Sequence, residues 1–145
     1  MTLKEKNYVD AVEQSIENFG AVQRDFVFDR RGVHALVTFV EELEGHPPVF
    51  SLDDPVIQKA RTATEKVITG LKSEIKILKK LKPPVRWETF HSVLLSSLQQ
   101  QHKGYREMFK VFKDGKAAHI IKGHEIVDQG LSLLAGGKKK TRGKK

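Results

Sequence analysis

Six basic side chains near the C-terminus are the residues of this sequence with the clearest chemistry. Residues 136–145 read GGKKKTRGKK, contain no acid, and supply Lys138, Lys139, Lys140, Arg142, Lys144 and Lys145. Such a dense cluster of cations attracts any polyanion, and binding to nucleic acid releases condensed counterions without needing a folded site. With one arginine and no aromatic residue, the segment lacks the groups that read bases or stack on them. It therefore predicts Coulombic binding that is independent of base sequence.

Three interpretations of this segment stay open. Its partner is nucleic acid or another polyanion, or it has no partner and only adds solubility, or it meets an anionic membrane surface. The membrane interpretation is the least favoured, because neither a lipidation site nor an adjacent amphipathic apolar anchor accompanies the cations.

A second group of cations lies in the middle of the chain. Lys72, Lys76, Lys79 and Lys80 recur at helical spacings of three and four residues, so they predict a basic ridge that could help to bind phosphates. Acidic residues, Glu65 and Glu74, interrupt this stretch and could pair with neighbouring lysines. The alternative interpretation is an ordinary solvated helix face.

The histidines do not form a metal-binding pattern. Glu88 and His91 make one Glu-x-x-His motif, whereas carboxylate-bridged di-iron bundles use two such motifs and two further glutamates. His119 and His124 are five residues apart, so on a helix they point about 140° apart. We therefore expect no metal and no cofactor, with His91 capping or packing near a helix start and His124 hydrogen-bonded and partly buried.

Nucleophilic catalysis is not indicated either. Ser92, Ser96 and Ser97 follow His91, but the sequence has no Gly-x-Ser-x-Gly elbow, and no glycine-rich phosphate loop or dinucleotide fingerprint. These observations predict a protein that is not an enzyme.

Composition limits the class of protein further. The 145 residues carry 26 Lys and Arg against 18 Asp and Glu, a net charge of +8, and six of those charges lie in residues 136–145. The absence of cysteine excludes disulfides, cysteine-ligated zinc and thiol nucleophiles. No apolar run approaches the roughly 20 residues of a membrane span, and the first ten residues do not resemble a signal peptide. A cytoplasmic location is therefore expected.

Helical periodicity accounts for almost all of the apolar residues. It predicts either one kinked helix or two helices over residues 4–45, with Thr2 as N-cap, and further helices over 55–81, 85–113 and 116–135. Pro47-Pro48, Pro83-Pro84 and Asp114-Gly115 separate these stretches. The predicted fold is an all-α, antiparallel up-and-down bundle of four or five helices over residues 1–135, and residues 136–145 form a disordered tail.

Residues 78–134 also carry a resemblance. The segments LKKLKPPVRWETFHSVLLSSL, FKDG and HEIVDQGLSLL resemble uncharacterised bacterial helical-bundle proteins, in which a helix ends in a proline pair and the next opens with an aromatic-histidine pair. The resemblance implies a helical bundle and carries over no activity and no site residue. Many such proteins are exported through an N-terminal signal or lipoprotein segment, which this sequence lacks.

The leading hypothesis is a non-enzymatic binding or scaffold bundle, tethered electrostatically to nucleic acid by residues 136–145. The alternative is a protein-interaction module, or a homo-oligomer formed through the wide apolar stripe of residues 19–39, in which the tail is only a solubility segment. A metal-binding bundle is the third hypothesis. The stripe comprises Phe19, Phe26, Phe28, Val33 and Phe39.

Overall fold

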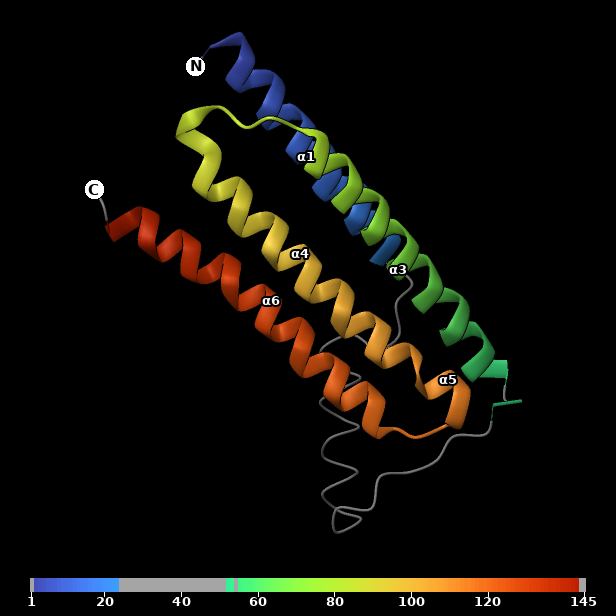
Figure 1. Cartoon of the computed structure of the whole chain (residues 1–145). Helices are drawn as coiled ribbons and strands as arrows, with labels where there is room; N and C mark the ends of the chain where they lie inside the picture. The colour runs from blue at the N-terminus through green and yellow to red at the C-terminus, as the bar shows by residue number, and fades with distance from the viewer. Residues whose placement is uncertain (1, 24–51, 54, 144–145) are drawn as a thin grey trace.

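A computed structural model describes residues 2–23, 52–53 and 55–143, and within them the protein is an all-α bundle (Figure 1). Its long helices alternate in direction along the chain, which confirms the predicted all-α fold and is consistent with the predicted antiparallel arrangement. Whether residues 24–45 form a second helix lies outside the described residues. The elements are α1 (Leu3–Gln23), α3 (Pro55–Lys80), η1 (Val85–Trp87), α4 (Glu88–Phe109), α5 (Val111–Asp114) and α6 (Ala118–Gly143).

Local signals set several of the helix boundaries. The Thr2 hydroxyl accepts a hydrogen bond from the backbone N–H of Glu5 at 3.2 Å, so Thr2 is the predicted N-cap of α1. At the end of α5, Gly115 has a φ of 73°, and its N–H donates to the Val111 carbonyl at 2.7 Å. Glycine adopts this left-handed conformation at little steric cost, and the conformation produces the predicted turn after Asp114.

The helix predicted over residues 85–113 is divided into three elements. A 3-10 turn, η1, precedes α4, and the chain bends at Lys110 before α5. After the bend, Val111 and Phe112 pack with Ala60 and Ile120 in a small apolar cluster at one end of the bundle. Tertiary packing therefore interrupts a helix whose apolar periodicity is continuous.

Helix α6 is longer than the sequence predicts. It continues through Gly136 and Gly137 to Gly143, where a helix end and a disordered tail were expected. A glycine in a helix interior costs about 1 kcal/mol relative to alanine, but it still supplies both backbone hydrogen-bonding groups. The glycine pair therefore weakens the helix without being obliged to end it.

The main core joins the four long helices of the described residues, α1, α3, α4 and α6. Leu71 and Leu78 of α3 and Met108 of α4 are almost fully buried, and Tyr8 and Val12 of α1 pack into the same cluster. These residues recur at the predicted helical spacings. The members of the cluster are Tyr8, Val12, Val67, Leu71, Leu78, Leu94, Leu98, Tyr105, Met108 and Val127.

Helices α4 and α6 approach each other at glycines. A Cβ atom built on Gly104 would lie 2.7 Å from the Gly123 carbonyl oxygen and 2.7 Å from the Val127 nitrogen. One built on Gly130 would lie 2.8 Å from the Ser97 carbonyl oxygen. The Ser97 hydroxyl donates to the Gly130 carbonyl at 2.7 Å, so a direct hydrogen bond also joins the two helices.

We expect Gly104→Ala to lower the free energy of unfolding by about 2 kcal/mol, because the new methyl group meets backbone atoms that can move only if the helices separate. Urea denaturation followed by circular dichroism measures this change. Gly70→Ala, in the partly exposed middle of α3, is the matched control and should be neutral or stabilising. Equal effects at the two positions would contradict close packing as the cause.

Candidate nucleic-acid interface

The predicted lysine ridge lies on the surface of α3. Lys72, Lys76, Lys79 and Lys80 are all exposed, and none of them forms an ion pair with another described residue. Their spacing places them on one flank of the helix. The ridge therefore carries uncompensated positive charge.

The two acidic residues of this stretch do not neutralise the ridge. Glu74 is buried on the core side of α3, where it accepts hydrogen bonds from the Ser15 hydroxyl at 2.6 Å and from the Asn18 amide at 3.4 Å. Glu65 pairs with Arg61 one turn earlier at 3.4 Å. Neither carboxylate forms an ion pair with a ridge lysine, although the sequence alone allowed such pairs.

The topology places the C-terminal ends of α3 and α6 at one end of the bundle. Both helices run in the same direction, so the C-terminal end of each lies at the same end of the bundle (Figure 1). Lys79 and Lys80 lie in the last turn of α3. The predicted site residues Lys138, Lys139, Lys140 and Arg142 lie on the last turns of α6, and Lys144 and Lys145 lie outside the described residues.

A groove between α3 and α4 is a further basic surface, which the sequence analysis missed. It encloses about 620 Å³, and its cations lie mainly along the flank of α4 and continue onto α5. They are spaced by three, four and three residues, a helical spacing that could have revealed them. The lining residues are Glu65, Ile68, Thr69, Lys103, Arg106, Glu107, Phe109, Lys110 and Lys113.

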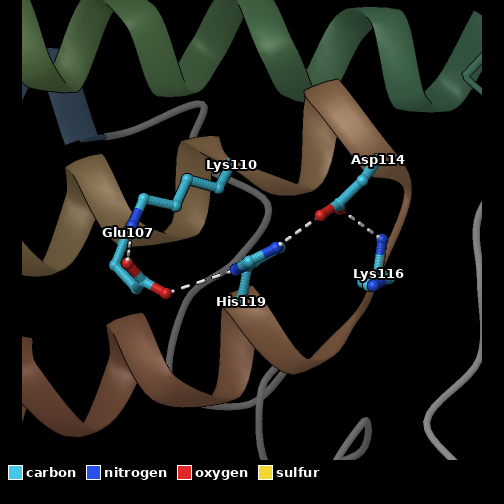
Figure 2. A network of polar contacts seen from close by, with 5 residues as sticks. All are labelled: Glu107, Lys110, Asp114, Lys116 and His119. Atoms are coloured by element: carbon cyan, nitrogen blue, oxygen red, sulfur yellow. Dashed lines mark hydrogen bonds and ion pairs between the residues drawn. The ribbon is translucent and has the colours of Figure 1, made fainter.

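The carboxylate of Glu107 makes polar contacts with two neighbouring side chains. Its Oε2 lies 2.7 Å from Lys110 Nζ, and its Oε1 lies 3.2 Å from His119 Nδ1 (Figure 2). These contacts lower the pKa of Glu107, with the hydrogen bond from Lys110 as the largest cause. The charge of Glu107 is therefore compensated locally. The remaining groove cations, Lys103, Arg106 and Lys113, form no ion pair with another described residue.

His119 joins α6 to both α4 and α5. While Nδ1 faces Glu107, Nε2 lies 2.8 Å from Asp114 Oδ2, as Figure 2 shows. Asp114 also accepts the backbone N–H of Lys116 at 2.9 Å; this bond and, next, the one from His119 lower the pKa of Asp114. These contacts of His119 and Asp114 hold the turn between α5 and α6 in place beside the groove.

His102 lies next to the groove cations. Its pKa is lowered first by burial and then by the positive charges of Arg106 and Lys72. Lys72 is a ridge residue of α3 and Arg106 is a groove residue of α4, so charges from both surfaces act on His102.

Three other candidates, His91, His124 and Ser97, contact residues of the bundle. His91 is buried at the start of α4, where its Nδ1 lies 2.8 Å from the Tyr8 hydroxyl. His124 is partly buried, and its Nε2 lies 3.4 Å from Asp128 Oδ2. The Ser97 hydroxyl binds the backbone of α6. Among the described residues, no group of three or more His, Asp or Glu side chains could hold a metal ion.

Comparisons with known proteins give no relative of this chain. No family model, no curated protein and no solved structure matches it. The resemblance to bacterial helical-bundle proteins is thus left untested. In the part of the chain that the structure describes, no helix has the length and apolar character needed to cross a membrane.

We expect Glu107→Gln to lower the free energy of unfolding by about 1–2 kcal/mol at neutral pH, because Lys110 and His119 lose a charged acceptor. The lowered pKa of Glu107 means that its contribution is complete above the unfolded value of 4.5 and is lost as the pH falls through the folded value. The difference between wild type and variant should therefore shrink in acid. Urea denaturation at several pH values measures it. Glu65→Gln, whose pair is half-exposed, should change stability by less than about 0.5 kcal/mol.

A second pH dependence comes from His91. Burial is the largest influence on its pKa and lowers it, while a hydrogen bond to the backbone of Leu78 partly opposes this effect. As the pH falls below 6.5, the unfolded chain takes up a proton that the folded chain resists, so stability falls by at most about 1.4 kcal/mol per pH unit until the folded pKa is reached. His91→Gln should reduce this slope, as measured by melting temperature between pH 7 and pH 5. An unaltered slope, or an equal reduction in His124→Gln, would contradict it.

Proposed function

We propose that this protein is a non-enzymatic helical bundle that binds nucleic acid electrostatically and without base-sequence specificity. The single observation that supports the proposal most is the shared end of α3 and α6. At that end of the bundle lie both the exposed lysines in the last turn of α3 and the last turns of α6, which contain the Lys- and Arg-rich segment. In this proposal the protein acts in the cytoplasm.

The mechanism is counterion release. Each phosphate that a cation neutralises contributes about −0.9 to the slope of log affinity against log salt for duplex DNA. If the six cations of residues 138–145 all contact phosphate, the slope is about −5. Contacts from the α3 ridge add to this value, so the affinity should fall steeply between low and physiological salt.

A second candidate function is supported by a different surface. Ile16 of α1 is 56% exposed, and Leu131 and Leu133 of α6 are 48% and 45% exposed. Ile16 and Leu131 also line a cavity of about 230 Å³ that all four long helices border. Exposed apolar residues around a cavity favour a contact with a protein partner or a second copy of the chain. In that case residues 136–145 only add solubility.

The test is a salt titration of binding to a generic duplex and a generic single-stranded RNA, using the full chain and a full-length variant with the six tail cations replaced by glutamine. We expect the tail variant to lose most of the affinity and about five units of the salt slope on duplex. Fluorescence anisotropy of labelled nucleic acid measures both quantities.

The contribution of the ridge is tested separately with Lys79→Ala/Lys80→Ala. Lys59→Ala/Lys66→Ala is the matched control, since it removes the same charge from the other half of α3. The ridge pair should weaken binding more than the control pair. If the unaltered chain binds neither nucleic acid at low salt, the proposed function is wrong, and a search for a protein partner of the bundle follows.

A further inference from the structure

We propose that the groove between α3 and α4 is a binding site for single-stranded nucleic acid, with phosphates against Lys103, Arg106 and Lys113 and a base against Phe109. This inference rests on the proposed function and specifies it, because it adds a folded site to the electrostatic tether. It also predicts a preference for single strands over duplex, which residues 136–145 cannot supply.

The charge of the groove favours an anion. Lys103, Arg106 and Lys113 are exposed and form no ion pair with another described residue. Lys103 and Arg106 lie on α4, and Lys113 continues the series on α5. From Lys103 to the end of α4 the flank is about 10 Å long at 1.5 Å per residue. The acids of the groove oppose this charge little, because Lys110 and His119 hold Glu107 and Arg61 holds Glu65.

The lining of the groove favours a single strand over a duplex. Ile68 and Phe109 are both partly buried and give the groove an apolar surface beside its cations. Proteins that bind single strands without sequence preference combine a cationic path for the phosphates with aromatic rings that stack on bases. A duplex keeps its bases stacked inside the double helix, so it could contact the cations but not Phe109.

The aromatic ring is held in a fixed orientation. Phe109 packs edge-on against Phe112 with ring centroids 5.3 Å apart, and the Arg61 guanidinium lies 5.8 Å from the Phe109 centroid. Both a phenyl ring and a guanidinium plane can support a nucleobase. A base in the groove could therefore stack on Phe109 or on the guanidinium that lies over its ring.

The groove is continuous with the predicted ridge. On α3, Lys72 follows Ile68 by one turn, and Lys76 and Lys79 follow at the same helical spacing. A strand seated on Phe109 could run along these lysines to the end of the bundle where α6 also ends. Burial lowers the pKa of His102 most, and the charges of Arg106 in the groove and Lys72 in the ridge lower it further, so cations of both surfaces act on this side chain.

The experiment uses the full chain with its six tail cations replaced by glutamine, so that binding by the tail is removed. A labelled oligo(dT) strand and a mixed-sequence duplex are titrated by fluorescence anisotropy at several salt concentrations. We expect weak residual binding of the single strand with a salt slope of about −2, since each of three phosphates contributes about −0.7. Duplex should bind this variant less tightly than the single strand does.

Lys103→Ala/Arg106→Ala/Lys113→Ala in the same background should abolish the residual binding. The matched control, Lys59→Ala/Lys66→Ala/Lys122→Ala, removes the same charge from exposed positions that do not line the groove and should retain it. Phe109→Leu, with an unchanged melting temperature, should weaken oligo(dT) binding about tenfold and leave duplex binding unchanged.

The outcomes separate this inference from the proposed function. If the unaltered chain binds nucleic acid but the tail variant binds no single strand, the groove site is wrong and the proposed function stands. Equal losses in the groove and control variants would also overturn the groove site. If the tail variant binds an acidic peptide but not oligo(dT), the groove is a site for a protein partner instead. If the unaltered chain binds no nucleic acid, both proposals fail.

Discussion

The backbone contact between α4 and α6 is the constraint on which much of the described structure depends. Gly104, Gly123 and Gly130 leave no room for side chains, so the two helices pack on each other's backbones, and Ser97 adds a hydrogen bond across the contact. Contact this close is possible in few registers, because a shift along either helix brings larger side chains into the glycine positions. The register in turn places His119 of α6 opposite Glu107 of α4. The polar network beside the groove is therefore a consequence of packing in the core.

The arrangement of acids determines where the positive charge of the bundle acts. Residues 1–135 have a balance of only +2, which would suggest a surface of mixed charge. In the structure, Glu74 is instead buried on the core side of α3, and Glu107 contacts Lys110 and His119. The cations that remain unpaired on α3 and α4 then face an anion with little opposition. A nearly neutral composition can thus carry a locally basic surface.

Much of the fold could be predicted from periodicity and turn residues. The start of α1 at Thr2, the extent of α3 and the turn at Gly115 follow from local signals that act within a few residues. The bend at Lys110 could not be predicted, because it depends on Val111 and Phe112 packing against Ala60 and Ile120, which are distant in sequence. The end of α6 was misplaced because a glycine pair reduces helix stability without preventing helix formation.

The candidate site was predictable only in part, for a similar reason. The lysine ridge appears as a dense run in the sequence, whereas the groove cations are diluted among apolar residues and become a site only when α3 lies alongside α4. The burial of Glu74 depends on its contacts with Ser15 and Asn18 of α1, so its inability to neutralise the ridge could not be inferred from α3 alone.

The two proposed binding elements differ in what each can contribute to recognition. The cations of residues 138–145 lie on a segment without aromatic residues, so they can supply attraction but cannot distinguish one base sequence from another. The groove has fewer unpaired cations, but Phe109 and its neighbours are held by the packed helices, so its binding would depend on the shape of the ligand. If both elements engage one strand, contact by the tail raises the effective concentration of that strand at the groove. Binding in the groove then adds a preference for single strands that the Coulombic attraction of the tail does not supply.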